Sequence, residues 1–327
     1  MKPKAALPLA LAAAIALFAA TPSHAQQKPS PTGTVVITLG TGGGPLPRAH
    51  RAQTANLLVV NGKPYLVDAG DGAVRRMVRA GYDFRHVDKI FITHAHSDHT
   101  NGLATFLNAQ WEYAKRAPTD VYGGGIEALV RGAIAFLTPN ADVRWTEGKR
   151  IRMDEVFRGH DVAPGVIYQD ANVRVTAVEN THFNFPPDTP AHGKYRSYSY
   201  RFDTANRVVV FTGDTGPSEA LTQLMKGADL LVTEVNVTEE VIELQKRNGS
   251  WQAKSAAEQE AWIRHMNEEH ITPEQVGRMA SAAGVKTVVL THFTPTVNRN
   301  DDYQRFVEAT RKVYSGQVLL ARDLMQF

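Results

Sequence analysis

Cysteine is absent from the 327-residue sequence. Its absence excludes disulfide bonds, thiolate metal ligands and a cysteine nucleophile. The sequence also carries little excess charge: the formal net charge is +3, or about +1 without Lys2 and Lys4 of the N-terminal segment. Binding to DNA is therefore not expected, because sequence-independent binders of nucleic acid carry a clear basic excess.

Long apolar runs are scarce as well, and only residues 5–20 approach the length of a bilayer span. This run belongs to a first segment, residues 1–25, that has the features of a signal peptide: basic Lys2 and Lys4, the apolar stretch, and Ser23-His24-Ala25 as a cleavage site. The sequence therefore predicts a periplasmic or secreted protein without stable membrane insertion. A retained membrane anchor is the alternative.

After a flexible leader at residues 26–33, residues 34–327 alternate short β-branched runs with helix-type patterns. This alternation predicts one large α/β domain. Polar residues follow five of the expected strands, and these residues are Asp68, His94, Asp214, Glu234 and His292. In α/β sheets, chemistry collects beyond the carboxyl ends of strands, so the five positions predict one convergent site.

The most informative motif is residues 93–103, Thr-His-Ala-His-Ser-Asp-His-Thr-Asn-Gly-Leu, which directly follows an apolar strand-type run. His94 and His96 alternate, so both can face one ion, while Asp98 and His99 could reach a second. Imidazole and carboxylate ligands suit zinc, and an all-nitrogen and oxygen site could also accept manganese or iron. The motif therefore predicts a metal site.

With this motif the chain resembles the metallo-β-lactamase superfamily, and within it the branch of ribonuclease Z and the arylsulfatase-like hydrolases. The matching stretches are Leu39–Gly44, Val67–Gly72, Thr93–Leu103, Tyr122–Ile126, Phe211–Gly216 and Leu290–Phe293. The resemblance implies an α/β fold of the αββα sandwich type, with a two-metal site at one edge of the sheets.

The resemblance also implies seven ligands for two zinc ions, three for each ion and one shared. The first set is His94, His96 and His182, the second is Asp98, His99 and His292, and the bridging ligand is Asp214. Asp68 would orient a ligand histidine by accepting its other N–H. A turn former before Gly70 is the alternative role for Asp68.

Two further residues match the proton donor of ribonuclease Z-like enzymes. Glu234 aligns with the acidic residue of that pair and His270 with its histidine, although Thr233 replaces another family histidine. Without the resemblance, His270 would be a surface residue flanking a helix. The implied mechanism uses a hydroxide that bridges the metals, Asp98 to orient or deprotonate it, and His270 to protonate the leaving group.

The chain departs from ribonuclease Z at two places. Between the strand-type runs 198–203 and 207–212 there is no room for the family's exosite arm, which makes precursor tRNA an unexpected substrate. Residues 237–269 form an insertion between Glu234 and His270 with helical periodicity. We interpret this insertion as a helical lid over the site, with a packing or dimerisation helix as the alternative, so a homodimer is possible.

The sequence therefore predicts an exported, binuclear zinc-dependent hydrolase of phosphodiester or aryl sulfate esters that acts on a small anionic substrate. Arg48 and Arg51 follow the first strand and could bind the anionic group, although exposed surface arginines are the commoner reason for such residues. A β-lactamase or lactonase is the second hypothesis. A catalytically silent metal-binding periplasmic protein is the third.

Overall fold

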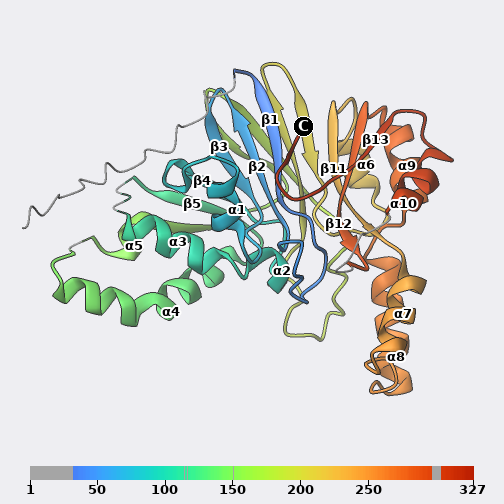
Figure 1. The fold of residues 1–327 in the computed structure, drawn as a ribbon, viewed down its shortest axis with the longest axis horizontal. Helices are drawn as coiled ribbons and strands as arrows, with labels where there is room; N and C mark the ends of the chain where they lie inside the picture. Colours follow the sequence, from blue (N-terminus) through green and yellow to red (C-terminus); the bar gives the residue numbers. More distant parts are fainter. Residues whose placement is uncertain (1–31, 114, 116, 150, 297–302) are drawn as a thin grey trace, which may run out of the picture.

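The computed structural model describes residues 32–113, 115, 117–149, 151–296 and 303–327 (Figure 1). The predicted signal peptide, residues 1–25, and most of the predicted leader lie outside the described residues. Strand structure begins at Thr34.

Two seven-stranded sheets form the inner layers of the molecule. In the first sheet the order is β14 (Met325–Gln326), β1 (Thr34–Gly40), β2 (Ala55–Val60), β3 (Lys63–Val67), β4 (Lys89–Phe91), β5 (Thr119–Gly123) and β6 (Phe157–Asp161). In the second it is β13 (Gln317–Leu320), β12 (Thr287–Thr294), β11 (Leu230–Asn236), β10 (Val208–Phe211), β9 (Tyr198–Thr204), β8 (Val173–Glu179) and β7 (Gly165–Gln169).

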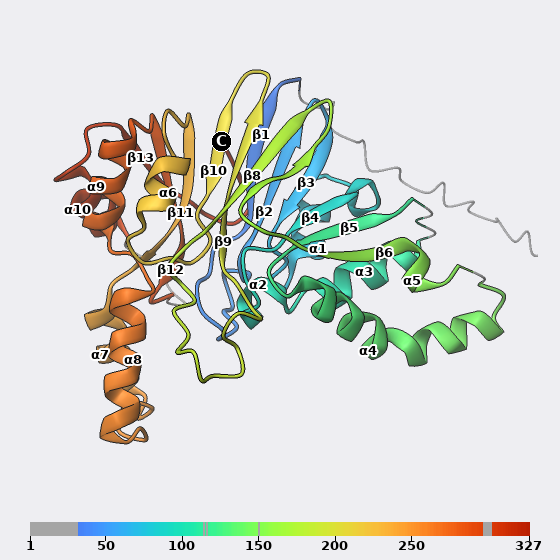
Figure 2. The same cartoon turned by 180° about the vertical axis from the view of Figure 1, so that it is seen from behind.

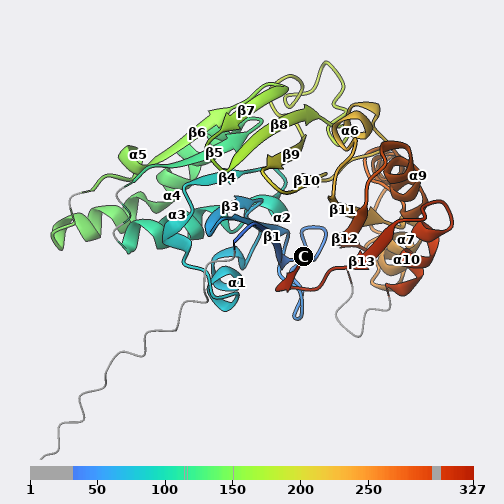
Figure 3. The ribbon, with the colours of Figure 1, turned by 90° about the horizontal axis from the view of Figure 1, so that it is seen from above.

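Helices cover the outer faces of both sheets. The helices are α1 (Ala73–Arg79), α2 (Ser97–Thr100), α3 (Leu103–Glu112), α4 (Ile126–Thr146), α5 (Met153–Val156), α6 (Glu219–Leu224), α7 (Thr238–Arg247), α8 (Ala256–Glu268), α9 (Pro273–Ala283) and α10 (Gln304–Arg311), with a 3₁₀ turn, η1, at Phe84–His86. In Figure 3, α3 and α4 lie at one side of the molecule and α9 and α10 at the other, with the strands between them. The predicted αββα sandwich is confirmed.

Alternation along the strands explains why the layers stack. In β1, Val36 belongs to the apolar cluster between the two sheets, whereas Ile37 and Leu39 belong to the cluster beneath α1, α3 and α4. Successive side chains of a strand point to opposite faces of the sheet. A strand that is covered on both faces, such as β1, therefore contributes side chains to two apolar clusters. Between the sheets Phe91 packs edge-on against Phe202, with ring centroids 5.2 Å apart. Burying such a ring contributes about 2–3 kcal/mol.

Parallel strands bring the chemistry to one end of the sandwich. β3, β4 and β5 run parallel in the first sheet, as do β10, β11 and β12 in the second. Asp68, His94 and Asp214 follow the ends of β3, β4 and β10, as predicted. The prediction that Glu234 and His292 also lie beyond strand ends is wrong, because both lie inside strands, β11 and β12. The pairing of these strands is irregular between Thr233 and Val235, and a bulge of this kind re-aims side chains locally.

The insertion 237–269 contains α7 and α8, which project together from the sandwich (Figures 1 and 2). Both helices carry local features that stabilise a helix. In α7, acidic residues occupy the first turn and basic residues the last, which suits the helix dipole. In α8, Ser255 and Glu258 form a reciprocal capping box. In the described part of the chain, none of the helices combines the length and apolar character that crossing a bilayer requires.

Candidate metal centre

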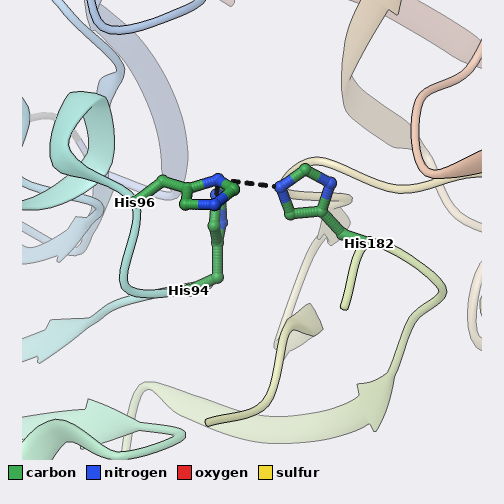
Figure 4. Close-up of side chains that lie close together, drawn as sticks. All are labelled: His94, His96 and His182. Atoms are coloured by element: carbon green, nitrogen blue, oxygen red, sulfur yellow. Dashed lines mark hydrogen bonds between the residues drawn. The ribbon is translucent and has the colours of Figure 1, made fainter. Parts of the chain in front are cut away.

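Three histidines from distant parts of the chain converge on one point (Figure 4). His94 and His96 lie in the short loop between β4 and α2, and His182 lies in the loop after β8. His96 Nδ1 is 3.1 Å from His94 Nε2 and 3.0 Å from His182 Nε2. Nitrogen ligands of a tetrahedral zinc ion lie about 3.3 Å apart, so the three rings are close to the geometry that such an ion needs.

A second cluster lies beside the first and consists of Asp98, His99, Asp214 and His292, all buried. Asp98 and His99 belong to α2, and His292 belongs to β12. His292 Nε2 is 3.1 Å from Asp98 Oδ2 and 3.2 Å from Asp214 Oδ1. The structure thus brings together all seven residues for which the sequence predicted a ligand role.

Asp214 lies between the two clusters. Its Oδ1 is 3.2 Å from His99 Nε2 in the second cluster, and its Oδ2 is 4.0 Å from His182 Nε2 in the first. Among the described residues, Asp214 Oδ1 and His99 Nε2 are buried atoms without a hydrogen bond of good geometry. Buried polar atoms are normally satisfied, so a donor set that faces inward in this way fits metal ions.

Asp68 holds one of these histidines in place. Its Oδ2 accepts a hydrogen bond from His99 Nδ1 at 2.9 Å, and its Oδ1 accepts from the backbone N–H of Thr93 at 2.8 Å. The contact fixes His99 Nε2 toward the cluster. Asp68 and His292 both have positive φ angles, 62° and 41°. Such conformations are costly for residues other than glycine and are typical of functional sites.

His270 and Glu234 form a buried pair at the same site although 36 positions separate them. His270 Nδ1 donates to Glu234 Oε2 at 2.8 Å and lies 4.0 Å from Asp214 Oδ2. The backbone N–H of Thr215 donates to Glu234 Oε1 at 2.6 Å, so both carboxylate oxygens are held. The pair is therefore fixed beside the residues of the metal clusters.

Residues 64–293 match the family model described as the Beta-lactamase superfamily domain. The chain belongs to the metallo-β-lactamase superfamily. Ribonuclease Z of Mycobacterium sp. (strain KMS) is 29% identical over 265 residues, which cover 80% of this chain and 85% of the relative. The resemblance to the ribonuclease Z branch is thereby confirmed.

Two solved structures share the fold. Human tRNase Z, short form, has a TM-score of 0.62 at 20% identity and covers 90% of this chain and 98% of its own. Zn²⁺-bound PqqB from Methylobacterium extorquens has a TM-score of 0.57 at 15% identity and covers 90% of this chain and 99% of its own. At these identities the likeness establishes the fold alone.

Burial and the carboxylates of the two clusters shift the pKa values of the histidines at this site. Burial lowers the pKa of His94 and of His182 well below the usual histidine range, which favours the neutral form that binds metal. Burial also acts to lower the pKa of His99, but the negative charges of Asp214 and Asp68 outweigh it, so the pKa of His99 is raised. The pKa of His270 is raised in the same way, because the effect of the Glu234 carboxylate outweighs that of burial.

The structure adds a residue that the sequence analysis missed. His265 of α8 lies beside the site, with its ring centroid 5.6 Å from that of His182 and 5.1 Å from that of His270. Its Nδ1 lies 2.7 Å from Glu269 Oε2. The backbone carbonyl of Glu269 also accepts from His182 Nδ1 at 2.9 Å. The segment after α8 therefore orients a residue of the first cluster, and only the i, i+4 pairing of His265 with Glu269 signals this in the sequence.

The two arginines considered as anion ligands behave differently. Arg51 donates to Thr41 Oγ1 at 2.6 Å and lies over the Phe293 ring, 4.9 Å from its centroid. It thus ties the loop after β1 to β12 and the expectation that it binds substrate is not supported. Arg48 instead lines a cavity of about 410 Å³ that opens onto the metal clusters.

Proposed function

We propose that this chain is an exported, binuclear zinc-dependent hydrolase that cleaves phosphodiester bonds, with sulfate esters as the related alternative. The observation that carries the proposal is the position of the His270–Glu234 pair, 4.0 Å from a carboxylate that faces both clusters. A proton donor fixed beside the metal ligands is needed most by poor leaving groups such as alkoxides. Opening of an amide or lactone ring depends less on it.

Two zinc ions held by the clusters would supply an activated water and neutralise the charge of the ester. The protein groups provide the remaining steps. Asp98 lines the cavity, where its carboxylate can orient the attacking water and accept its proton. His270 uses Nδ1–H to bind Glu234, so its Nε2–H can protonate the departing oxygen. The proposal of zinc is supported by the imidazole and carboxylate donors and by the Zn²⁺ bound to PqqB, and the same donors would also accept manganese or iron.

RNA must be weighed as a substrate, because the curated relatives are named ribonuclease Z. That name counts against the expectation that precursor tRNA is not cleaved. The hairpin between β9 and β10 turns at Ala205 and Asn206 and leaves no room for a long arm there. We therefore propose a small ester and treat RNA as the competing substrate.

The proposal is tested by a hydrolysis panel on the zinc-loaded protein lacking residues 1–25. The substrates are a bis-aryl phosphate, an aryl sulfate, a chromogenic cephalosporin, a lactone and a precursor tRNA. We expect turnover of the phosphodiester or the sulfate ester to exceed that of the others, to be lost with a chelator and to return with zinc. Preference for the cephalosporin or for tRNA would overturn the substrate assignment.

A second experiment tests the proton donor. His270→Ala is expected to lower kcat by roughly 10²- to 10⁴-fold for an alkyl leaving group, with metal content unchanged. The loss is expected to shrink for nitrophenolate, which departs without a proton. His86→Ala, in the η1 turn, is the matched control. Equal losses for both leaving groups would remove His270 from this role.

A further inference from the structure

The cavity beside the metal clusters has walls of unlike chemistry. One part of the lining comes from the α7–α8 insertion and includes apolar Val241, Leu244, Trp262 and Met266 beside polar Gln245, Asn248, Ser250 and His265. Another part is the loop that follows β1, which carries Leu46 and Arg48. The base is formed by residues of the site, Asp98, Asp214 and His270 among them. At about 410 Å³ the cavity has the size of a small-molecule site.

The apolar wall is held in shape. Trp262 packs edge-on against Trp251, with ring centroids 5.7 Å apart. Met266 is 6% exposed, and its carbonyl accepts from the Asn236 side chain of β11 at 3.1 Å. The α7–α8 insertion is thereby anchored to β11, the strand that carries Glu234. Leu46, in the loop after β1, also lines the cavity and is 57% exposed. These side chains offer an apolar surface to a ligand.

The charge of the cavity limits what can enter. Among the described lining residues the carboxylates are Asp98 and Asp214, both in the metal clusters, and the guanidinium is that of Arg48. The Nε atom of Arg48 is buried without a hydrogen-bond partner among those residues. An unpaired buried donor suits an anionic ligand oxygen. A polynucleotide would require a track of basic residues along its phosphates, and among the described lining residues Arg48 is the one lysine or arginine.

We infer that this cavity is an apolar subsite for one organic group, aryl or bulky alkyl, of a singly charged ester, with Arg48 contributing the cationic contact. The inference rests on the proposed function and names its substrate class as hydrophobic phosphodiesters of small size. The α7–α8 insertion then determines specificity while the clusters and His270 perform the chemistry.

Binding of ligands without an ester bond tests the inference independently of turnover. Calorimetry on the zinc-loaded protein compares diphenylphosphinate with dimethylphosphinate, which carry the same single charge, have P–C bonds in place of ester bonds and differ in their apolar groups. We expect diphenylphosphinate to bind roughly 10- to 100-fold more tightly, because burial of one ring contributes that factor. Equal affinities, or tighter binding of a short single-stranded RNA than of diphenylphosphinate, would overturn the inference.

Variants separate the two contacts. Trp262→Ala is expected to reduce the diphenyl preference to within about threefold, since it removes the largest apolar side chain of that wall. Trp145→Ala on α4, where the side chain is 48% exposed, is the matched control and should retain the preference. Arg48→Met is expected to weaken the binding of both phosphinates to a similar extent and to keep the ratio of their affinities. An unchanged preference in a folded Trp262→Ala protein would place the aryl group elsewhere.

The outcomes for the two proposals differ. If the wild-type protein binds diphenylphosphinate selectively and hydrolyses no ester in the panel, the subsite stands and the proposed function fails. If it hydrolyses diesters and binds both phosphinates equally, the function stands and the subsite fails.

Discussion

Replacement of Gly216 by alanine tests whether the insertion supports the metal site. A Cβ atom at this position would lie 1.8 Å from the carbonyl oxygen of Glu268 and 3.0 Å from Thr181 Oγ1. Real Cβ contacts essentially never fall below 3.0 Å, so the chain must absorb a displacement of about 1.2 Å. The obstacle is backbone, which cannot rotate away as a flexible side chain can.

The displacement acts on His182 from two directions. Glu268 precedes Glu269, whose carbonyl accepts the Nδ1–H of His182, and Thr181 directly precedes His182. Loss of a group that orients a ligand histidine typically costs 10- to 100-fold in metal affinity. We therefore expect Gly216→Ala to weaken zinc binding by about 10- to 100-fold, with the larger effect at the cluster of His94, His96 and His182.

Competition with a chromophoric chelator on metal-free protein measures both affinities. Gly132→Ala is the control, because Gly132 lies in α4 with no atom within 4 Å of its added Cβ and alanine is favoured in helices. Circular dichroism establishes that both variants are folded. Wild-type affinity at both clusters in a folded Gly216→Ala protein would refute the reasoning, and so would selective loss at the cluster of Asp98 and His99.

Three further predictions concern other parts of the chain. Burial alone would raise the pKa of Asp170, but a hydrogen bond from Lys63 outweighs it and lowers that pKa. The ionised Asp170 therefore stabilises the folded protein at neutral pH, and this stabilisation is lost as pH falls below the ordinary aspartate range. Asp170→Asn should lower the free energy of unfolding by about 2 kcal/mol at pH 7, and urea titrations at pH 3 should show a smaller difference. Asp68→Asn should weaken zinc binding by about 10- to 100-fold in the chelator assay, whereas intact affinity would leave Asp68 only its turn role. Our proposal of export predicts that N-terminal sequencing of the protein from its native cells starts at Gln26, whereas an uncleaved chain would favour the anchor alternative.

The sequence was most informative where chemistry and strand geometry coincide. The motif at residues 93–103 could be interpreted without the rest of the chain, because imidazole and carboxylate groups at alternate positions after an apolar strand are typical of a metal site. The expectation that functional residues follow the carboxyl ends of strands, the strand-end rule, placed Asp68, His94 and Asp214 at one end of the sandwich, where the structure has them. Both inferences depend on local backbone geometry, which a short stretch of sequence determines.

The rule failed at Glu234 and His292 because their strands continue past the expected ends. Whether a strand continues depends on its neighbours, and β11 and β12 extend each other as a parallel pair through Asn236 and Thr294. The irregular pairing around Glu234 is a property of that pair. No single stretch of sequence contains it, so tertiary context overrides the local boundary signal.

The sequence also could not show which of Arg48 and Arg51 is available to bind an anionic ligand. Both residues lie on one loop, and composition gives no reason to prefer either. Arg51 meets the aromatic ring of Phe293, which is 242 positions away in the chain, and is thereby committed to packing. Arg48 meets no such partner among the described residues and lines the cavity. A binding residue is recognised here by a polar group that has no partner within the described part of the folded chain. Which groups lack a partner can be seen only once segments distant in the sequence are placed together.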